Sequence, residues 1–294
     1  MGLRQQVDCK SDIPGPIASG CGALAPVGLR ARGFARANFA RVGDRTEPGR
    51  VYEAGGLRLR FPHATGCQAV LVNTAGGMAS GDRAVIDLAL EAGAEVFATT
   101  QSAEKVYRAE ADECRIECSL RLGAGSRLVW APQETILFDN ARLRRRLEAD
   151  VDPDAFLLLI ESVVFGRLAM GETDIEARLA DDWRIRRGGR LVFAEALHID
   201  SARTALKSCA VARGARAIAS FLLMAPDATA PLTALRQTLE QEADAPGEAL
   251  EAGVSAVDGF LVGRALSPSP ARLRAAIVAV MMTLTGQGPP RMWR

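Results

Sequence analysis

The chain has 294 residues, of which 48% are hydrophobic and 24% charged, values typical of a globular protein with one large domain or two small ones. Its net charge of +1 provides no overall field that would attract nucleic acid or an anionic membrane surface. No segment reaches the roughly 18 apolar residues of a membrane span, no secretory signal is visible, and six cysteines are too few for a disulfide scaffold. We therefore expect a cytoplasmic protein without nucleic-acid or membrane partners.

The first 27 residues differ in composition from the rest. They contain Pro14, Pro16 and Pro26 together with four glycines, and their apolar residues follow neither a helical nor a strand period. This composition predicts a flexible N-terminal extension over residues 1–27, followed by a single β-rich domain over residues 28–294.

Most of the segment 29–266 carries the patterns of β-strands. Apolar and polar residues alternate over 114–122, which is the period of a half-buried strand. Short apolar runs bounded by Gly, Pro or Asp suit buried strands. These runs are 69–73, 95–100 and 127–130.

An internal repeat organises these strands. A strand, a tight turn and a second strand recur at intervals of about 30 residues, with the turns at 92–94, 123–125 and 152–154. The repeat favours a mainly β fold, built as a β-helix-like stack of strands. Strands at regular spacing also occur in sandwiches, so that alternative stays open.

The last quarter of the chain predicts a small C-terminal α-helical part. Leu232, Leu235 and Leu239 have helical spacing within 231–243, and a second helix is expected over 268–284 with Ser267 or Ser269 as its N-cap. A pair of strands is expected between them, over 249–266. The closing residues are apolar, so Trp293 is expected to pack against the rest of the protein.

Motifs of nucleotide binding and covalent catalysis are missing. The sequence has no G-x-x-x-x-G-K-[ST] loop, no G-x-G-x-x-G between a strand and a helix, and no G-x-S-x-G elbow. His63 and His198 are the only histidines, and the four-residue spacing from His63 to Cys67 is weak support for a thiol nucleophile. We predict no catalytic residue and no tightly bound cofactor, and hence a protein that is not an enzyme.

Six carboxylates stand out because they follow glycines or lie in and beside apolar runs. They are Asp82, Glu104, Glu134, Asp139, Glu161 and Glu172. Glu104, Glu134 and Glu161 all come shortly after the second strand of a repeat unit, so stacking is expected to bring them near one another. Buried like charges are costly unless they are paired or meet a cation. The residues alone leave open pairing with arginines, a polar channel for a divalent cation, and a glycosidase-type pair.

Several blocks of sequence resemble the UreD family of urease accessory proteins, called UreH in some organisms. The blocks are LVNTAGGMASGD at 71–82, TTQSAEKVYR at 99–108, WAPQETILFDNARL at 130–143, Gly166-Arg167, Gly171-Glu172 and PRMW at 290–293. They keep the family's order and spacing from about residue 30 to the end. Ser80 and Asn140 depart from the glycines usual in the family, although asparagine tolerates a left-handed turn.

The resemblance implies a non-catalytic scaffold of urease maturation with a β-helix-like fold. Such a scaffold is expected to bind apo-urease and the accessory protein UreF, and through UreF the GTPase UreG, in a hetero-oligomeric complex that guides nickel to the urease site. The six carboxylates are then expected to line or gate a nickel passage, as transient oxygen ligands. Of the six, Asp82 and Glu172 are favoured because each follows glycine.

Two functions of other classes remain as alternatives. A carboxylate-dependent β-helix hydrolase acting on carbohydrate would need a groove rich in aromatic residues, whereas the aromatic content is only 5%. A purely structural β-solenoid would pair all of its carboxylates with arginines.

Overall fold

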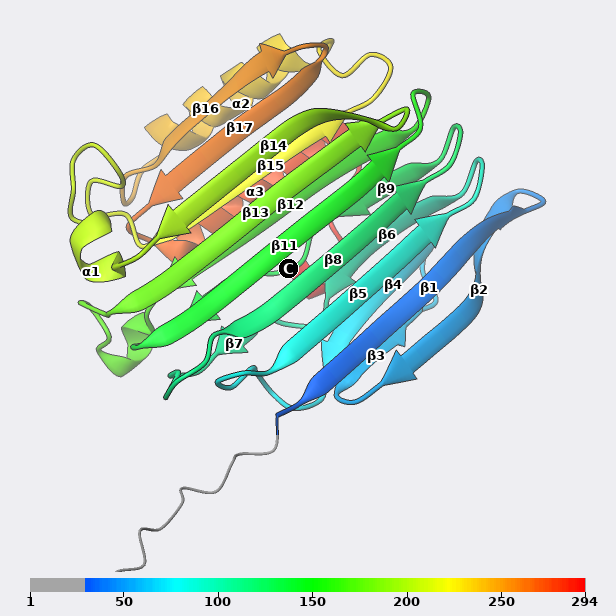
Figure 1. Cartoon of the computed structure of the whole chain (residues 1–294). Helices are drawn as coiled ribbons and strands as arrows, with labels where there is room; N and C mark the ends of the chain where they lie inside the picture. Colours follow the sequence, from blue (N-terminus) through cyan, green and yellow to red (C-terminus); the bar gives the residue numbers. More distant parts are fainter. Residues whose placement is uncertain (1–29, 294) are drawn as a thin grey trace, which may run out of the picture.

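Two β-sheets lie face to face in the computed structural model, which describes residues 30–293 (Figure 1). Sheet A has seven strands in the order β14-β13-β11-β8-β5-β1-β2. Its strands are β1 (Arg32–Val42), β2 (Arg45–Ala54), β5 (Arg83–Leu90), β8 (Cys114–Leu122), β11 (Ala141–Val151), β13 (Ala177–Arg187) and β14 (Arg190–Ile199). The predicted flexible extension, residues 1–27, lies outside the described residues.

Sheet B lies behind sheet A in Figure 1 and has ten strands. Eight follow the order β16-β17-β15-β12-β9-β6-β4-β3, while β10 pairs with β12 and β7 pairs with β10. The strands are β3 (Leu57–Arg60), β4 (Cys67–Asn73), β6 (Glu95–Thr100), β7 (Glu104–Val106), β9 (Arg127–Trp130), β10 (Thr135–Leu137), β12 (Phe156–Phe165), β15 (Ala217–Met224), β16 (Glu251–Val257) and β17 (Phe260–Ser267). Inward side chains of both sheets, such as Leu120 of β8 and Leu128 of β9, form one core.

The internal repeat determines how the strands are distributed between the sheets. β5 leads into β6, β8 into β9 and β11 into β12, with the first strand of each pair in sheet A and the second in sheet B. Neighbouring units stack parallel and in register, since Cys118 pairs with both Ile86 and Leu147. Aligned inward positions bury one apolar row against the next. The predicted β-helix-like stack is confirmed, and antiparallel hairpins flank it.

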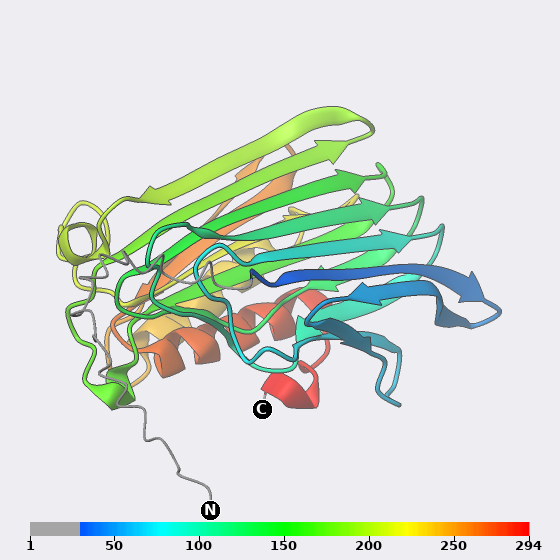
Figure 2. The same cartoon turned by 60° about the horizontal axis from the view of Figure 1, so that its bottom comes forward.

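Two helices cover part of the outer face of sheet B (Figure 2). They are α2 (Leu232–Asp244) and α3 (Pro270–Thr285), close to the predicted ranges. Leu235 and Leu239 of α2 join a second apolar cluster with Leu158 and Ile160, which point outward from β12. The short helices are α1 (Ala202–Ala205), η1 (Leu168–Met170) and η2 (Arg291–Trp293). Among the described residues, no helix combines the length and apolar character needed to cross a membrane.

Ser269 caps α3. Its Oγ accepts a hydrogen bond from the backbone N–H of Arg272 at 3.4 Å, and Pro270 occupies the first turn, where a missing N–H is tolerated. We expect Ser269→Ala to lower the free energy of unfolding by about 1 kcal/mol, measured by urea denaturation. Ser255→Ala, at an exposed position of β16, is the control and should change it by less than about 0.5 kcal/mol. Equal effects would contradict a role of Ser269 as the cap.

Trp293 packs against sheet B, as the sequence predicts. Its side chain is buried, and its Nε1 donates to Thr99 Oγ1 at 3.0 Å and to the carbonyl oxygen of Ala131 at 3.2 Å. The guanidinium of Arg274 lies 4.6 Å from the centre of the Trp293 ring. The segment 290–293 therefore covers β6 and β9 where the two long helices do not.

Candidate functional site

Asp82 fixes the glycine-rich loop between β4 and β5. It is 8% exposed, and its Oδ1 and Oδ2 accept hydrogen bonds from the backbone N–H groups of Ala31 and Ala79, both at 2.8 Å. Gly77 has a φ of 155° in this loop, and a Cβ atom there would lie 2.5 Å from the ring of Tyr107. Ser80 ties the loop to Asp112, donating to its carbonyl oxygen at 2.9 Å. Both oxygens of Asp82 thus have backbone partners.

Glu104, the first residue of β7, has an amide as its partner. Asn73 Nδ2 lies 3.1 Å and 3.2 Å from the two carboxylate oxygens of Glu104. Burial raises the pKa of Glu104 to about 7, although the hydrogen bond from Asn73 opposes this shift. Near neutral pH, Glu104 therefore exchanges between its protonated and ionised forms.

Asn73 connects the surroundings of Asp82 and Glu104. A cavity of about 20 Å³ is bordered by Asn73, Met78 and Asp82, and another of about 80 Å³ by Asn73, Gln101 and Glu104. Two carboxylates and the amides of Asn73 and Gln101 thus border small spaces that share Asn73. Oxygen donors of this kind suit hard or borderline divalent cations.

The backbones of Glu134 and Glu104 are hydrogen-bonded to each other, but the Glu134 carboxylate has a different partner. The carbonyl oxygen of Glu134 accepts from the Glu104 N–H at 2.9 Å, in the pairing of β7 with β10. Its carboxylate accepts from Arg274 Nη1 at 2.8 and 2.9 Å. Arg274 also contacts Trp293, so Glu134 helps to hold the C-terminal segment.

Asp139 and Glu172 lie at two loops beside the stack. Asp139 Oδ1 accepts from the backbone N–H of Glu176 at 2.8 Å. Asn140 has a φ of 61°, so the left-handed turn that asparagine tolerates is present. Glu172 forms an ion pair with Arg167 and accepts from its backbone N–H at 2.9 Å. The hydrogen bond from the Arg167 side chain is the main cause of the lowered pKa of Glu172.

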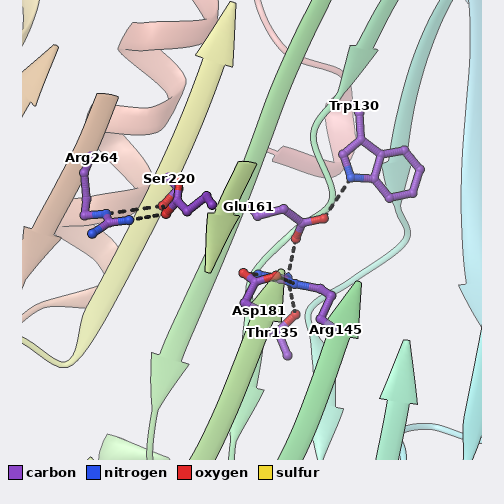
Figure 3. Close-up of polar contacts among 8 residues, drawn as sticks. Trp130, Thr135, Arg145, Glu161, Asp181, Ser220 and Arg264 are labelled. Atoms are coloured by element: carbon purple, nitrogen blue, oxygen red, sulfur yellow. Dashed lines mark hydrogen bonds and ion pairs between the residues drawn. The ribbon is translucent and has the colours of Figure 1, made fainter. Parts of the chain in front are cut away.

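Glu161 belongs to a buried cluster that joins the sheets (Figure 3). Its Oε1 accepts from Trp130 Nε1 at 2.8 Å, and its Oε2 accepts from Arg145 of sheet A. Arg145 Nε also donates to Asp181 Oδ1 at 2.9 Å. The exposed fractions of Arg145, Glu161 and Asp181 are 3%, 5% and 5%, so solvent screens these charges little.

The charges of this cluster do not balance, because two carboxylates share one guanidinium. Burial raises the pKa of Glu161, and Arg145 offsets only part of that effect. Burial also disfavours the charged form of Arg145, but Asp181 and Glu161 outweigh this and raise its pKa. The guanidinium therefore stays charged, while Glu161 holds a proton more readily than an exposed glutamate.

Three of the thiols in the described part of the chain are unsuited to nucleophilic chemistry. Burial raises the pKa of Cys67 and Cys118, and it raises that of Cys114 to about 12, with Asp82 and Glu104 adding smaller effects. The thiolate, which is the reactive form, is therefore rare at neutral pH. Cys114 and Cys118 are buried in the core between the sheets.

The six predicted residues have separate partners and form no joint metal centre. Over residues 30–293, no group of three or more His, Cys, Asp or Glu side chains is placed to hold a metal ion. Arginines pair with Glu134, Glu161 and Glu172, whereas Asp82, Glu104 and Asp139 accept from backbone or amide groups. Arginine pairing of every carboxylate, as in the purely structural alternative, is therefore not observed. A nickel-passage role stays a prediction.

Four side chains that donate to these carboxylates were not singled out from the sequence. They are Asn73, Trp130, Arg145 and Arg274. A signal existed for Arg145, which interrupts the inward apolar positions of β11 between Leu143 and Leu147. Asn73 lies at the end of β4, directly before the glycine-rich loop.

Comparison with known proteins identifies a family. The family model described as "UreD urease accessory protein" matches residues 31–294. The chain is 43% identical over 269 residues to the urease accessory protein UreD of Rhodopseudomonas palustris strain HaA2, covering 90% of this chain and 94% of the relative. It is 46% identical over 253 residues to UreD of Beijerinckia indica, covering 85% and 92%. With one family model matching nearly the whole described structure, the chain belongs to the UreD family of urease accessory proteins.

Proposed function

We propose that this protein is a non-catalytic scaffold of urease maturation. It binds apo-urease and the accessory protein UreF, and UreG through UreF, and it helps to guide nickel into the urease site. The observation that carries this proposal is the family match, which extends over the complete stack of strands and both long helices.

The surroundings of Asp82 and Glu104 support a path for nickel along the protein. Oxygen and amide groups border two adjoining small spaces that share Asn73. Each carboxylate already has a hydrogen-bond partner, so a passing ion competes with that partner and is not held tightly. A hydrated cation can then move on, whereas thiolates or several imidazoles would release nickel slowly.

The first test is urease activation in cells that carry the structural urease genes and the other accessory genes. With this protein present, active and nickel-loaded urease is expected; without it, urease should remain largely apo. Equal nickel content and activity in both strains would contradict the proposal.

We expect Asp82→Asn to slow urease activation while leaving complex assembly intact. Asparagine keeps one oxygen acceptor for the loop but removes the negative charge that attracts a cation. Activation would be followed as urease activity against time after nickel addition, and assembly by co-purification with the accessory proteins. Asp150→Asn, at an exposed position of β11, is the matched control. Identical activation rates for the two variants would exclude Asp82 from the path.

A further inference from the structure

Four arginines form an in-register row across the outer face of sheet A. Arg32 of β1 pairs with Arg83 of β5, Arg83 with Arg115 of β8, and Arg115 with Arg144 of β11. Neighbouring strands lie roughly 4.8 Å apart, so the four arginine side chains project from adjacent backbone positions at one end of the sheet. All four side chains are exposed.

Like charges directly opposite each other on neighbouring strands destabilise a sheet. The row is only partly neutralised: Glu117 pairs with Arg83 at 2.6 Å, and Glu113 serves both Arg115 at 3.2 Å and Arg144 at 2.7 Å. Arg32 forms no ion pair with any of the described residues. A local arrangement that costs stability is characteristic of functional surfaces.

A cleft of about 680 Å³ opens along this row. Seven arginines and four carboxylates line it, and one of those carboxylates, Asp82, is already bound to backbone N–H groups. Besides Arg32, the cleft residues Arg142 and Arg178 have no carboxylate partner within residues 30–293. These two arginines occupy directly opposite positions on the neighbouring strands β11 and β13. The cleft is therefore electropositive although the whole chain has a net charge of only +1.

We propose that this arginine row and its cleft are a docking surface for an acidic segment of a partner protein. Guanidinium groups bind carboxylates in a bidentate, directional manner, and several in a row match acidic side chains on an extended chain. Glu113 and Asp112 line the same cleft and repel any polyanion, most strongly a nucleic acid, in which every nucleotide carries a charged phosphate. Binding depends on the arginines of this face and does not require nickel.

The test uses the full-length protein and a fluorescein-labelled polyglutamate peptide, with binding followed by fluorescence anisotropy. The triple variant R83Q/R115Q/R144Q is expected to bind about tenfold more weakly than the wild type at low ionic strength. The matched control R121Q/R184Q/R186Q removes three arginines from the other end of the same face and should keep wild-type affinity. R83K/R115K/R144K retains the charge but not the bidentate donor geometry, so it should recover only part of the binding. Thermal unfolding of each variant verifies folding.

Three results would overturn the proposal. The first is an absence of peptide binding by the wild type at low ionic strength, and the second is an equal loss in the two glutamine variants. The third is tighter binding of a single-stranded oligonucleotide than of the peptide, lost in R83Q/R115Q/R144Q, which would identify a nucleic-acid surface instead. Addition of inorganic phosphate as a competitor separates recognition of an extended acidic chain from simple anion binding.

Discussion

Replacing Arg145 with methionine is expected to destabilise the protein by about 3–5 kcal/mol at neutral pH. Arg145 is the only cation bonded to the buried carboxylates of Glu161 and Asp181 among the described residues. Without it, two acidic groups remain between the sheets with no counter-charge, and each must either stay ionised in an apolar environment or bind a proton. Urea denaturation followed by circular dichroism measures the effect.

The pH dependence and a matched variant make this prediction specific. The defect of Arg145→Met should shrink as the pH falls, because protonation removes the unpaired negative charges. Arg146→Met, next along β11 but exposed and, within residues 30–293, paired only with Glu148, should cost less than about 1 kcal/mol. Similar losses in the two variants would contradict a special role of the buried cluster. R145M/E161L/D181L, which removes all three charges, should recover much of the lost stability.

Glu104→Gln is expected to stabilise the protein above neutral pH by up to about 3 kcal/mol, because the folded protein holds the Glu104 proton more tightly than the unfolded chain. The pKa of Glu104 is about 7 in the folded state, against an ordinary value of 4.5. Below pH 4.5 the residue is protonated in both the folded and the unfolded state, so it adds no pH dependence to the free energy of unfolding. Between 4.5 and 7 the unfolded chain releases the proton first, so the free energy of unfolding falls as the pH rises and levels off above 7.

This dependence is measured from urea midpoints at a series of pH values between 4 and 8. Glutamine is uncharged and keeps an oxygen that can accept from Asn73. The contribution of residue 104 to the free energy of unfolding should therefore no longer change with pH across this range. Glu240→Gln, at an exposed position of α2, is the control and should leave the wild-type profile unchanged. A Glu104→Gln profile with the same slope as the wild type would show that Glu104 is not the group responsible.

Local signals explain which parts of the fold could be predicted. The turns of the repeat at 92–94, 123–125 and 152–154 contain Gly, Pro or Asp between apolar strands, so the spacing indicated stacking before any partner strand was known. Helix α3 begins close to its predicted start because Ser269 and Pro270 act through neighbouring backbone groups. The places of the antiparallel hairpins in the two sheets could not be predicted in this way, because they depend on contacts between residues distant in the sequence.

The partners of the carboxylates were less predictable for the same reason. Glu161 meets Arg145 from the opposite sheet, and Glu134 meets Arg274 at a separation of 140 residues. Abundant arginine made such pairs plausible for every carboxylate but selected none of them. The separate partners of Glu104, Glu134 and Glu161 follow from the side to which each strand directs its side chain. Stacking pairs β7 with β10 and β10 with β12, yet each of these carboxylates has its own partner.

The docking of Trp293 on Thr99 has a consequence for folding during synthesis. These two residues are separated by 194 positions, and at about 5–20 residues per second the ribosome needs roughly 10–40 s to make the intervening chain. During that interval the outer surface of β6 and β9 lacks the cover that residues 290–293 later provide. A nascent chain therefore presents an apolar sheet surface to chaperones for many seconds, and slower translation of the 3′ part of the gene should lengthen its exposure to aggregation.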